Sequence, residues 1–304
     1  MKTFFFTSVL LLLSLTLFAQ DRFDVFYIGG NYNFIGTTNA NPNENFDTHL
    51  KSNLSVPIVL KDSSIWFNSV DYQYFLTKNE YLASTVNPID GFNLHGIMLR
   101  TGYVHRFNSQ RSLQVLFVPR YMSDMNANFS NSLQLGGIVM YEKVKNEDYT
   151  WRVGVIYNNE FFGTYIVPVF YLDWNMTSKI KVKGLLPVYG KLYTEPSEKV
   201  DIGLHFIGLT TSHRIYEPGY ENAYVERKFI DVSVFGNFHL FDNIFMEARA
   251  GYSLSRDYGL YADGDKVDLG MPLVYFGDNR TRLNEEFDGG AFVHLRFIYS
   301  IPVD

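Results

Sequence analysis

Charged and polar side chains recur at every second position along many extended segments of this 304-residue chain. Around residues 179–183, lysines alternate with Ile180 and Val182. Because successive side chains of a β-strand point to opposite faces, this pattern separates charged from apolar side chains. Parity within each segment predicts one shared polar face, whose charged members are Asp71, Arg100, Arg120, Arg152, Lys181, Lys183, Asp201, His205, Asp231, Glu247, Arg249, His294 and Arg296, with Gln73, Gln134 and His239 beside them.

Such a face has two possible uses if the strands enclose a lumen. Rings of charged side chains select solutes in pores. Alternatively, the charges pair with one another and fill the interior, with Asp201, Asp231 and Glu247 as expected partners of Arg152 and the lysines. The sequence leaves both uses open, and both hold if the loop at 257–288 partly plugs a narrow lumen. Small solutes are the expected ligands, and no cofactor is expected.

Hydrolysis of membrane lipid is the alternative chemistry. His205 with Asp201, or His294 with Ser300, could be arranged as a lipid-facing acyl-hydrolase site. Two residues four apart on one strand, however, are separated by about 13 Å at ~3.3 Å per residue, too far for a hydrogen bond. Neither G-x-S-x-G nor H-E-x-x-H occurs in the chain. We therefore predict no catalytic residues and a protein that is not an enzyme.

Three aspartates gather around a glycine in the segment ADGDKVD. Asp263, Asp265 and Asp268 lie in the longest predicted loop, and oxygen-rich loops with glycine suit calcium. The complete EF-hand spacing is missing, and an acidic solvated loop explains the same residues. The prediction is that no metal is bound, with these aspartates as the calcium candidates.

The elements that position these residues are predicted to be β-strands. No segment sustains the i, i+3, i+4, i+7 apolar spacing of a helix, and strand formers alternate with polar residues almost throughout. Short turns join many segments and make neighbours antiparallel. Thirteen strands are predicted, at 24–35, 49–60, 65–76, 92–107, 112–122, 132–143, 150–158, 163–174, 179–191, 199–212, 227–240, 243–256 and 289–301.

These strands favour a closed antiparallel up-and-down transmembrane β-barrel over a secreted soluble β-protein. Many are 11–14 residues long, against ~5–6 in soluble sheets. Bacterial single-chain barrels have an even number of strands. We therefore expect 12, with 14 as the alternative if one more strand lies near residues 269–276. The expected lipid face in the stretch 151–190 is Val153, Val155, Tyr165, Val167, Val182 and Val188.

Composition and the N-terminus narrow the location. Lys2 followed by an apolar run to Ala19 predicts a cleaved signal peptide at 1–20, followed by one barrel domain at 21–304. Cysteine is absent, so disulfides cannot hold the fold, and a net charge of −6 argues against a nucleic-acid partner. The expected partners are outer-membrane lipid, small solutes and the machinery that inserts barrels.

Three segments resemble a known family: 53–62, 99–121 and 161–204 are similar to predicted Gram-negative (Bacteroidetes-type) outer-membrane β-barrels of unknown function. Pro168 followed by Ile180, Val182 and Pro187 carries the family pattern. The resemblance implies a barrel in the outer membrane of a Gram-negative bacterium. It implies no reaction and transfers no active site.

Overall fold

The computed structural model describes residues 22–34, 46–78, 89–286 and 289–302. The predicted signal peptide at 1–20 lies outside the described residues, as do parts of three predicted loops. Within the described chain, no helix has the length and apolar character needed to cross a membrane.

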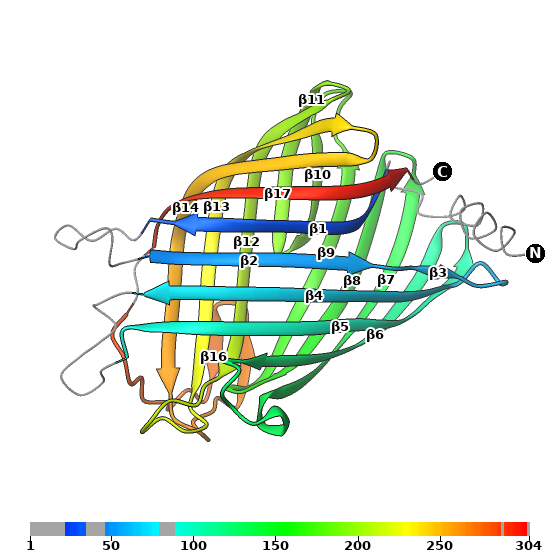
Figure 1. Ribbon diagram of the computed structural model, residues 1–304. Coiled ribbons are helices and arrows are strands. Elements are labelled where there is room, and N and C mark those ends of the chain that lie inside the picture. Colours follow the sequence, from blue (N-terminus) through cyan, green and yellow to red (C-terminus); the bar gives the residue numbers. More distant parts are fainter. Residues whose placement is uncertain (1–21, 35–45, 79–88, 287–288, 303–304) are drawn as a thin grey trace, which may run out of the picture.

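Fourteen antiparallel strands form a closed up-and-down barrel (Figure 1). Each wall strand pairs with its neighbours in sequence, and the last strand pairs with the first along Arg22–Pro302 to Asn33–Phe292, which closes the barrel. A two-residue strand, β3 (Ile58–Val59), continues β2 along β4. The wall strands are β1 (Arg22–Asn33), β2 (Phe46–Ser55), β4 (Ile65–Lys78), β5 (Gly91–Asn108), β6 (Arg111–Ser123), β7 (Leu133–Asn146), β8 (Tyr149–Glu160), β9 (Gly163–Asn175), β10 (Lys181–Leu186), β11 (Tyr189–Ser197), β12 (Val200–Arg214), β13 (Tyr224–Phe241), β14 (Ile244–Tyr261) and β17 (Gly290–Pro302).

The expectation of 12 strands is wrong, and the alternative of 14 is confirmed. The segment predicted as one strand at 179–191 is the source of the difference. It turns at Pro187 and Val188 and continues as two paired strands, β10 and β11. The predicted extra strand at 269–276 is instead a small hairpin, β15 (Leu269–Met271) and β16 (Val274–Phe276), inside the connection between β14 and β17.

This strand count sorts the connections between the two ends of the barrel. The strand ends that lead into the five long connections, at 34–45, 79–90, 124–132, 215–223 and 262–289, all lie at one end, which we call the loop end, and the short turns at 161–162 and 187–188 face the same way. The other end, called the terminal end, holds the remaining turns and both ends of the described chain, at Arg22 and Pro302. Long loops gathered at one end are typical of outer-membrane barrels.

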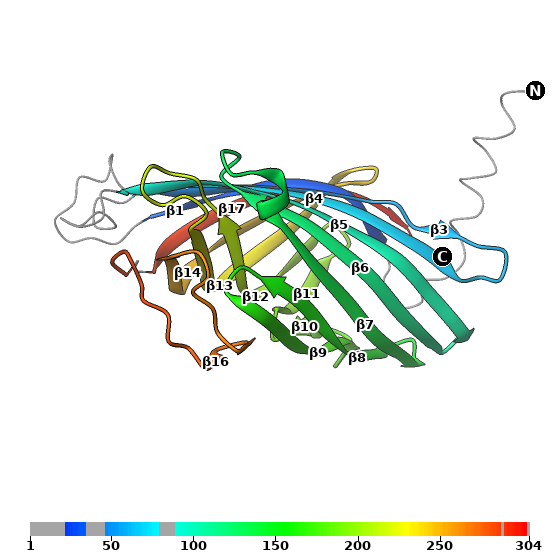
Figure 2. The ribbon, with the colours of Figure 1, turned by 90° about the horizontal axis from the view of Figure 1, so that it is seen from below.

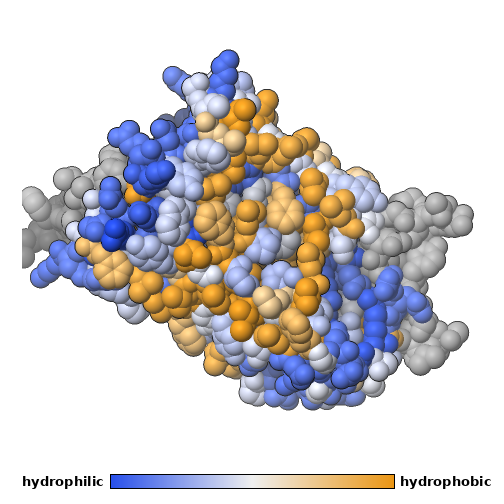
Figure 3. Space-filling view, turned by 180° about the vertical axis from the view of Figure 1, so that it is seen from behind, coloured by the Kyte–Doolittle hydropathy of each residue, from blue (hydrophilic) through white to orange (hydrophobic). Residues whose placement is uncertain are grey.

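The outward side chains of the wall are largely apolar. Figure 3 shows apolar side chains gathered across the middle of one face, with hydrophilic side chains toward its edges. Phe117, Val155 and Val234 are 52%, 44% and 58% exposed, and each alternates with buried or half-buried neighbours. An exposed apolar band on a closed barrel is suited to lipid, because a bilayer offers the backbone no hydrogen-bond partners.

An apolar cluster packs across the loop end of the barrel. There β13 and β14 run steeply across the strands β1 to β5 (Figures 1 and 2). The inner faces of the two groups pack together in this cluster, which includes Phe75 and Leu94 on one side and Val225, Tyr258 and Leu260 on the other. All five side chains are fully buried. The cluster therefore occupies part of the lumen at the loop end.

The predicted lipid face of β9 is wrong. Tyr165 and Val167 are buried, at 5% and 6% exposure, and point into the barrel with Val169. Phe170 on the opposite face is 40% exposed. The two faces of this strand are both apolar, so alternation of polarity could not decide between them. One stretch of the inner wall is consequently apolar.

Candidate functional site

Five neighbouring strands place a row of polar side chains at one level of the lumen. Lys51 of β2 and Arg296 of β17 both oppose Gly29 of β1, and Arg296 in turn opposes Glu247 of β14. Glu247 opposes Asn237 of β13. A Cβ atom at position 29 would lie 2.8 Å from the Cβ atom of Arg296, so glycine leaves room for the large side chains beside it. Directly opposed residues on one face are in side-chain contact range.

Glu247 is the centre of this row because three cations share it. Lys191 Nζ lies 2.5 Å and Arg296 Nη2 3.3 Å from Oε2 of Glu247. Arg249 donates to Oε1 through Nε at 2.7 Å and also through Nη2. The Glu247 side chain is 1% exposed. One buried carboxylate therefore offsets three positive charges, which leaves a local excess of two.

Two further cations next to this row have no carboxylate of their own. Among the described residues, no carboxylate oxygen lies within 4.0 Å of Lys51 Nζ or of the Arg227 guanidinium. Arg227 donates from Nε to the hydroxyl of Tyr258 at 3.0 Å, and its guanidinium lies 4.1 Å from the ring centroid of Phe75. Lys51 Nζ lies 5.5 Å from the ring centroid of Phe229. Aromatic faces attract cations but do not neutralise them.

Asp231 and Asp47 offset one more arginine beside the row. Arg256 Nε lies 3.3 Å from Asp47, and its Nη2 lies 3.6 Å from Asp231. We define the cation cluster as the six cations Lys51, Lys191, Arg227, Arg249, Arg256 and Arg296, which face the three carboxylates Asp47, Asp231 and Glu247. The cluster carries a net charge of +3 with its histidines neutral. An anionic group would be drawn to it.

The predicted polar residues fall into two groups. All thirteen charged candidates are buried or half-buried. Asp231, Glu247, Arg249 and Arg296 belong to the cation cluster, and His205 and His294 lie beside it: Arg249 Nη1 is 3.3 Å from Nδ1 of His205, while Nδ1 of His294 is bonded to the side chain of Asn31. The rest form separate pairs, namely Asp71 with Arg100, Arg120 with Glu160, Arg152 with Glu142, Lys181 with Glu195, Lys183 with Asp173 and Asp201 with Arg22.

The partners expected for Arg152 and the lysines are therefore wrong. Arg152 pairs with Glu142 on the adjacent strand β7, at 2.5 Å. Lys183 pairs with Asp173 on the adjacent strand β9, at 3.2 Å. Each of these pairs consists of directly opposed residues, as the register shows. Short-range pairing across neighbouring strands replaces the expected pairing across the lumen.

Sequence reasoning missed five members of the cation cluster: the cations Lys51, Lys191, Arg227 and Arg256, and the carboxylate Asp47. Arg227 and Arg256 stand at the limits of predicted strands, where parity assigns no face. Lys191 ended a predicted strand that in fact turns before it. Lys51 lies in a strand whose residues are mostly polar, so alternation gave no signal there. A correct strand count would have recovered Lys191.

Neither of the two residue pairs considered for hydrolysis is joined by a hydrogen bond in the structure. His205 contacts Arg249, while Asp201 accepts hydrogen bonds from Arg22 and Asn237. Ser300 donates to Asp24 at 2.6 Å and not to His294. The alternative acyl-hydrolase assignment therefore gains no support from the positions of its candidate residues.

The calcium candidates are dispersed in the structure. Asp263 pairs with Arg214 at 2.9 Å, and Asp265 accepts from the backbone of Thr281 at 3.4 Å. Over the part of the chain that the structure describes, no three acidic or histidine side chains are grouped so as to hold a metal ion. Asp268 is therefore not part of a described metal cluster.

Comparisons with known proteins assign no ligand to this chain. A family model described as "Domain of unknown function (DUF6268)" matches residues 15–264 and confirms the resemblance to a family without an assigned function. Among solved structures, the NanC porin is 11% identical with a TM-score of 0.38, and 91% of this chain and 99% of that chain are covered.

Two other solved structures show a similar degree of likeness. The toluene transporter TodX of Pseudomonas putida is 12% identical with a TM-score of 0.39, over 90% of this chain and 88% of that chain. LpxR from Salmonella typhimurium is 7% identical with a TM-score of 0.35, over 90% and 99%. At these identities and TM-scores, none of them indicates what this chain binds. A comparison with curated protein sequences gave no match.

Proposed function

Because the chain belongs to the DUF6268 family, whose description assigns no function, we propose that it is an outer-membrane barrel that admits small anionic solutes to its lumen. The observation that carries the proposal is the charge imbalance at Glu247, which three cations share while Lys51 and Arg227 have no carboxylate. Buried cations without partners are costly. A solute anion entering the lumen would offset them, so the lumen favours anions over cations.

The apolar band, the placement of the loops and the strand count are also consistent with entry of a small solute. The exposed apolar band fits a membrane, and the placement of long loops at one end fits the outer membrane, with the loop end outside. Fourteen strands fall between the eight whose interior side chains can fill and the 16–18 of open porins. The lumen is therefore narrow, and its charged side chains lie close to any solute within it. The same proposal includes export of this chain to the outer membrane and cleavage of its signal peptide.

Planar-bilayer recording in a KCl gradient tests this function. We expect openings whose reversal potential shows a preference for chloride over potassium. Lys51→Gln and Arg249→Gln should move the reversal potential toward zero selectivity. Lys183→Gln is the matched control, because it removes a charge of the same sign that is already paired with Asp173.

A second measurement distinguishes a barrel that binds anions without conducting them from a barrel that does not bind anions. Citrate, compared with NaCl at equal ionic strength, should raise the thermal unfolding midpoint of the detergent-solubilised protein, since a ligand that binds only the folded state stabilises it. Lys51→Gln should reduce this rise, and Lys183→Gln should leave it unchanged. Preference for potassium contradicts the proposal and indicates a cation channel. No conductance together with no citrate effect also contradicts it and leaves a purely structural barrel.

A further inference from the structure

The barrel wall is interrupted between β9 and β12. The two strands between them are short: β10 has six residues and β11 nine, against 13 and 15 for β9 and β12. The ladder from β10 reaches β9 only as far as Phe170, and the ladder from β11 reaches β12 only as far as Ile207. Residues 163–169 of β9 and 208–214 of β12 therefore extend toward the loop end with no wall strand between them.

The hairpin β15–β16 stands at this interruption. Gly270 of β15 forms a single parallel bridge with Tyr165 of β9, and Val267 N donates to Phe162 O at 2.8 Å. Among the described residues, no ladder joins β16 to β12. One face of the hairpin carries Tyr275, whose hydroxyl donates to Glu226 at 2.5 Å. The hairpin is thus attached to the wall mainly along one edge.

The opposite face of the hairpin is apolar and uncovered. Val274 and Phe276 alternate with Tyr275 and are 48% and 51% exposed, and Leu273 at the tip is 87% exposed. Neighbouring side chains of a strand point in opposite directions. Val274 and Phe276 therefore point away from Glu226 and the barrel. This outward apolar face matches the lipid-facing band of the wall.

At the free edge of β12, the backbone of Ser212 forms hydrogen bonds with side chains and not with a neighbouring strand. Glu160 accepts from Ser212 N at 3.0 Å and from its hydroxyl at 2.7 Å, and Gln134 donates to Ser212 O at 3.2 Å. Arg120 pairs with Glu160 at 2.9 Å, and both side chains are almost completely buried. In a membrane every backbone group needs an internal partner. The backbone of Ser212 therefore has its partners without a neighbouring strand and without the hairpin.

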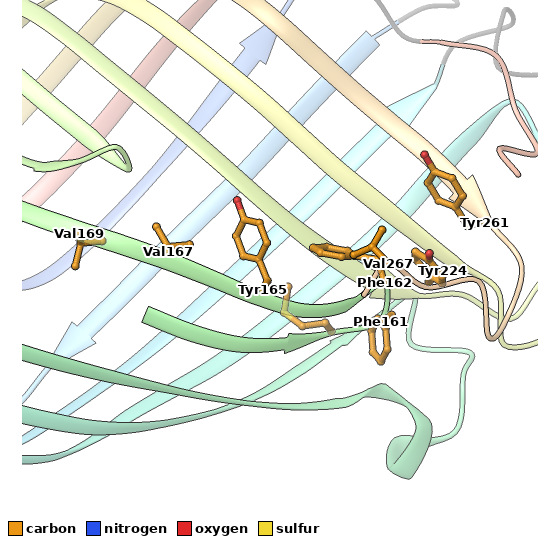
Figure 4. Packing of buried hydrophobic residues seen from close by; sticks show 9 residues of the cluster. Phe161, Phe162, Tyr165, Val167, Val169, Tyr224, Tyr261 and Val267 are labelled. Carbon is orange, nitrogen blue, oxygen red and sulfur yellow. The ribbon is translucent and has the colours of Figure 1, made fainter. Parts of the chain in front are cut away.

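The inner wall directly behind the hairpin is apolar. Tyr165, Val167 and Val169 follow one another along the inner face of β9, and Phe162 lies next to Val267 (Figure 4). Leu185 continues this surface: it opposes Tyr171 on one side and Tyr189 on the other. Two residues beyond Tyr189 on the same face is Lys191, a member of the cation cluster. An apolar surface thus leads from the interruption to buried positive charge.

We propose that the hairpin Leu269–Phe276 is a movable section of the wall through which a single-chain amphiphile with an anionic head group passes between the membrane and the lumen. Its chain lies along Val167, Val169 and Leu185, and its head group meets Lys191 and Arg249. The packing of β4 and β5 against β13 and β14 narrows the axial route from the loop end. The lateral route depends on the wall alone, whereas the anionic head group rests on the function proposed above.

An engineered disulfide tests the lateral route, since the chain has no cysteine of its own. Tyr165→Cys with Gly270→Cys joins β9 to β15 at their bridging residues. Leu269→Cys with Phe276→Cys is the matched control, because it closes the hairpin on itself and leaves it free to move as a unit. The probe is a fatty acid bearing a diazirine, incorporated into vesicles that contain the full barrel, and mass spectrometry locates its photoadducts.

We expect adducts on the inner face of β9, at Val167 and Val169, in the reduced proteins and in the oxidised control. Oxidation of the Tyr165→Cys, Gly270→Cys protein should abolish them, while adducts at the outward residues Val153 and Val155 persist. Inner-face adducts that survive oxidation, or that are absent from every protein, overturn the lateral route.

A long-chain alcohol bearing the same diazirine separates this inference from the proposed function. Weaker labelling by the alcohol than by the fatty acid, with the difference removed by Lys191→Gln, supports the anionic head group. Equal labelling by both probes overturns the head-group assignment even if the disulfide blocks both. Chloride selectivity without labelling that depends on the disulfide overturns the lateral route and leaves the proposed function standing.

Discussion

The two sides of the lumen arrange their charges differently. Along β7 to β10, Arg152, Lys181 and Lys183 each have a carboxylate on an adjacent strand. On the side formed by β14, β17, β1 and β2, Glu247 serves three cations, one of which, Lys191, reaches it from β11, and Lys51 has no carboxylate within 4.0 Å in the described chain. Paired charges complete the wall by themselves. A surplus of one sign leaves something for a ligand to offset.

Burial sharpens this difference. Glu247 is 1% exposed, whereas Glu142 and its partner Arg152 are each 22% exposed at the side chain. Electrostatic interactions are stronger away from water and weaker where water reaches the pair. The two sides should therefore differ in stability as well as in affinity for anions.

The largest effect is expected from Glu247→Gln. Removing the carboxylate leaves the half-buried cations Lys191, Arg249 and Arg296 together without a counter-charge. The free energy of unfolding should fall by about 3–5 kcal/mol as a result. Urea unfolding in detergent, followed by tryptophan fluorescence, measures this loss. Glu142→Gln is the matched control on the paired side, where one cation loses its partner in a wetter site, and its loss should be about 1 kcal/mol. Equal losses would remove the distinction between the two sides.

A smaller effect is expected from replacing one lysine on each side by methionine, which keeps the length of the side chain. Lys183→Met leaves Asp173 half-buried without its partner and should cost about 1–3 kcal/mol. Lys51→Met removes a cation that has no carboxylate, and the loss of its contact with Phe229 should cost less than about 1 kcal/mol.

Function should respond in the opposite order to these two substitutions. Lys51→Met should weaken chloride selectivity and the citrate effect, whereas Lys183→Met should leave both unchanged. The unfolding midpoint and the reversal potential of each variant provide the two readings. If Lys183→Met altered selectivity more than Lys51→Met, the paired side and not the surplus side would be the one that meets the solute.

Much of the wall could be predicted from the sequence because a membrane strand must separate apolar from polar side chains. Val153 and Val155 were assigned outward on this ground, and they are exposed. The same rule failed for β9, since Tyr165 and Phe170 lie on opposite faces and are both apolar. It also failed at Pro187, because a two-residue turn returns the chain with its alternation unbroken.

The candidate site was less predictable because its contacts are distant in sequence. Lys191 and Glu247 are separated by 56 residues, and Lys191 was read as the end of a strand that turns before it. Arg227 meets His49 across 178 residues. Strand count and register bring these residues together, and neither can be read from one strand alone. Pairs on adjacent strands, such as Arg152 with Glu142, depend on a single hairpin register.

The hairpin β15–β16 provides the smallest test, because water reaches one of its anchoring charges: the side chain of Asp278 is 33% exposed, whereas those of Arg280 and Glu226 are 1% exposed. Arg280, in the loop after β16, lies 2.9 Å from Asp278 and 3.1 Å from Glu226 of β13. The side-chain hydrogen bond from Arg280 lowers the pKa of Asp278, against the opposing effect of its partial burial. A carboxyl group with a lowered pKa in the folded state stabilises that state above its unfolded pKa of about 3.9, and this contribution is lost as the pH falls through the lowered value.

Acid should therefore loosen the hairpin before it affects the buried charges around Glu247. We expect hydrogen exchange of residues 269–276, corrected for the intrinsic effect of pH, to become faster as the pH drops below about 4, by an amount equivalent to less than about 1 kcal/mol. Asp278→Asn should exchange at the faster rate already at neutral pH and lose part of this pH dependence. A variant that kept the full pH dependence would show that Asp278 does not hold the hairpin, and the attachment would then rest on Tyr275 and the bridge to β9.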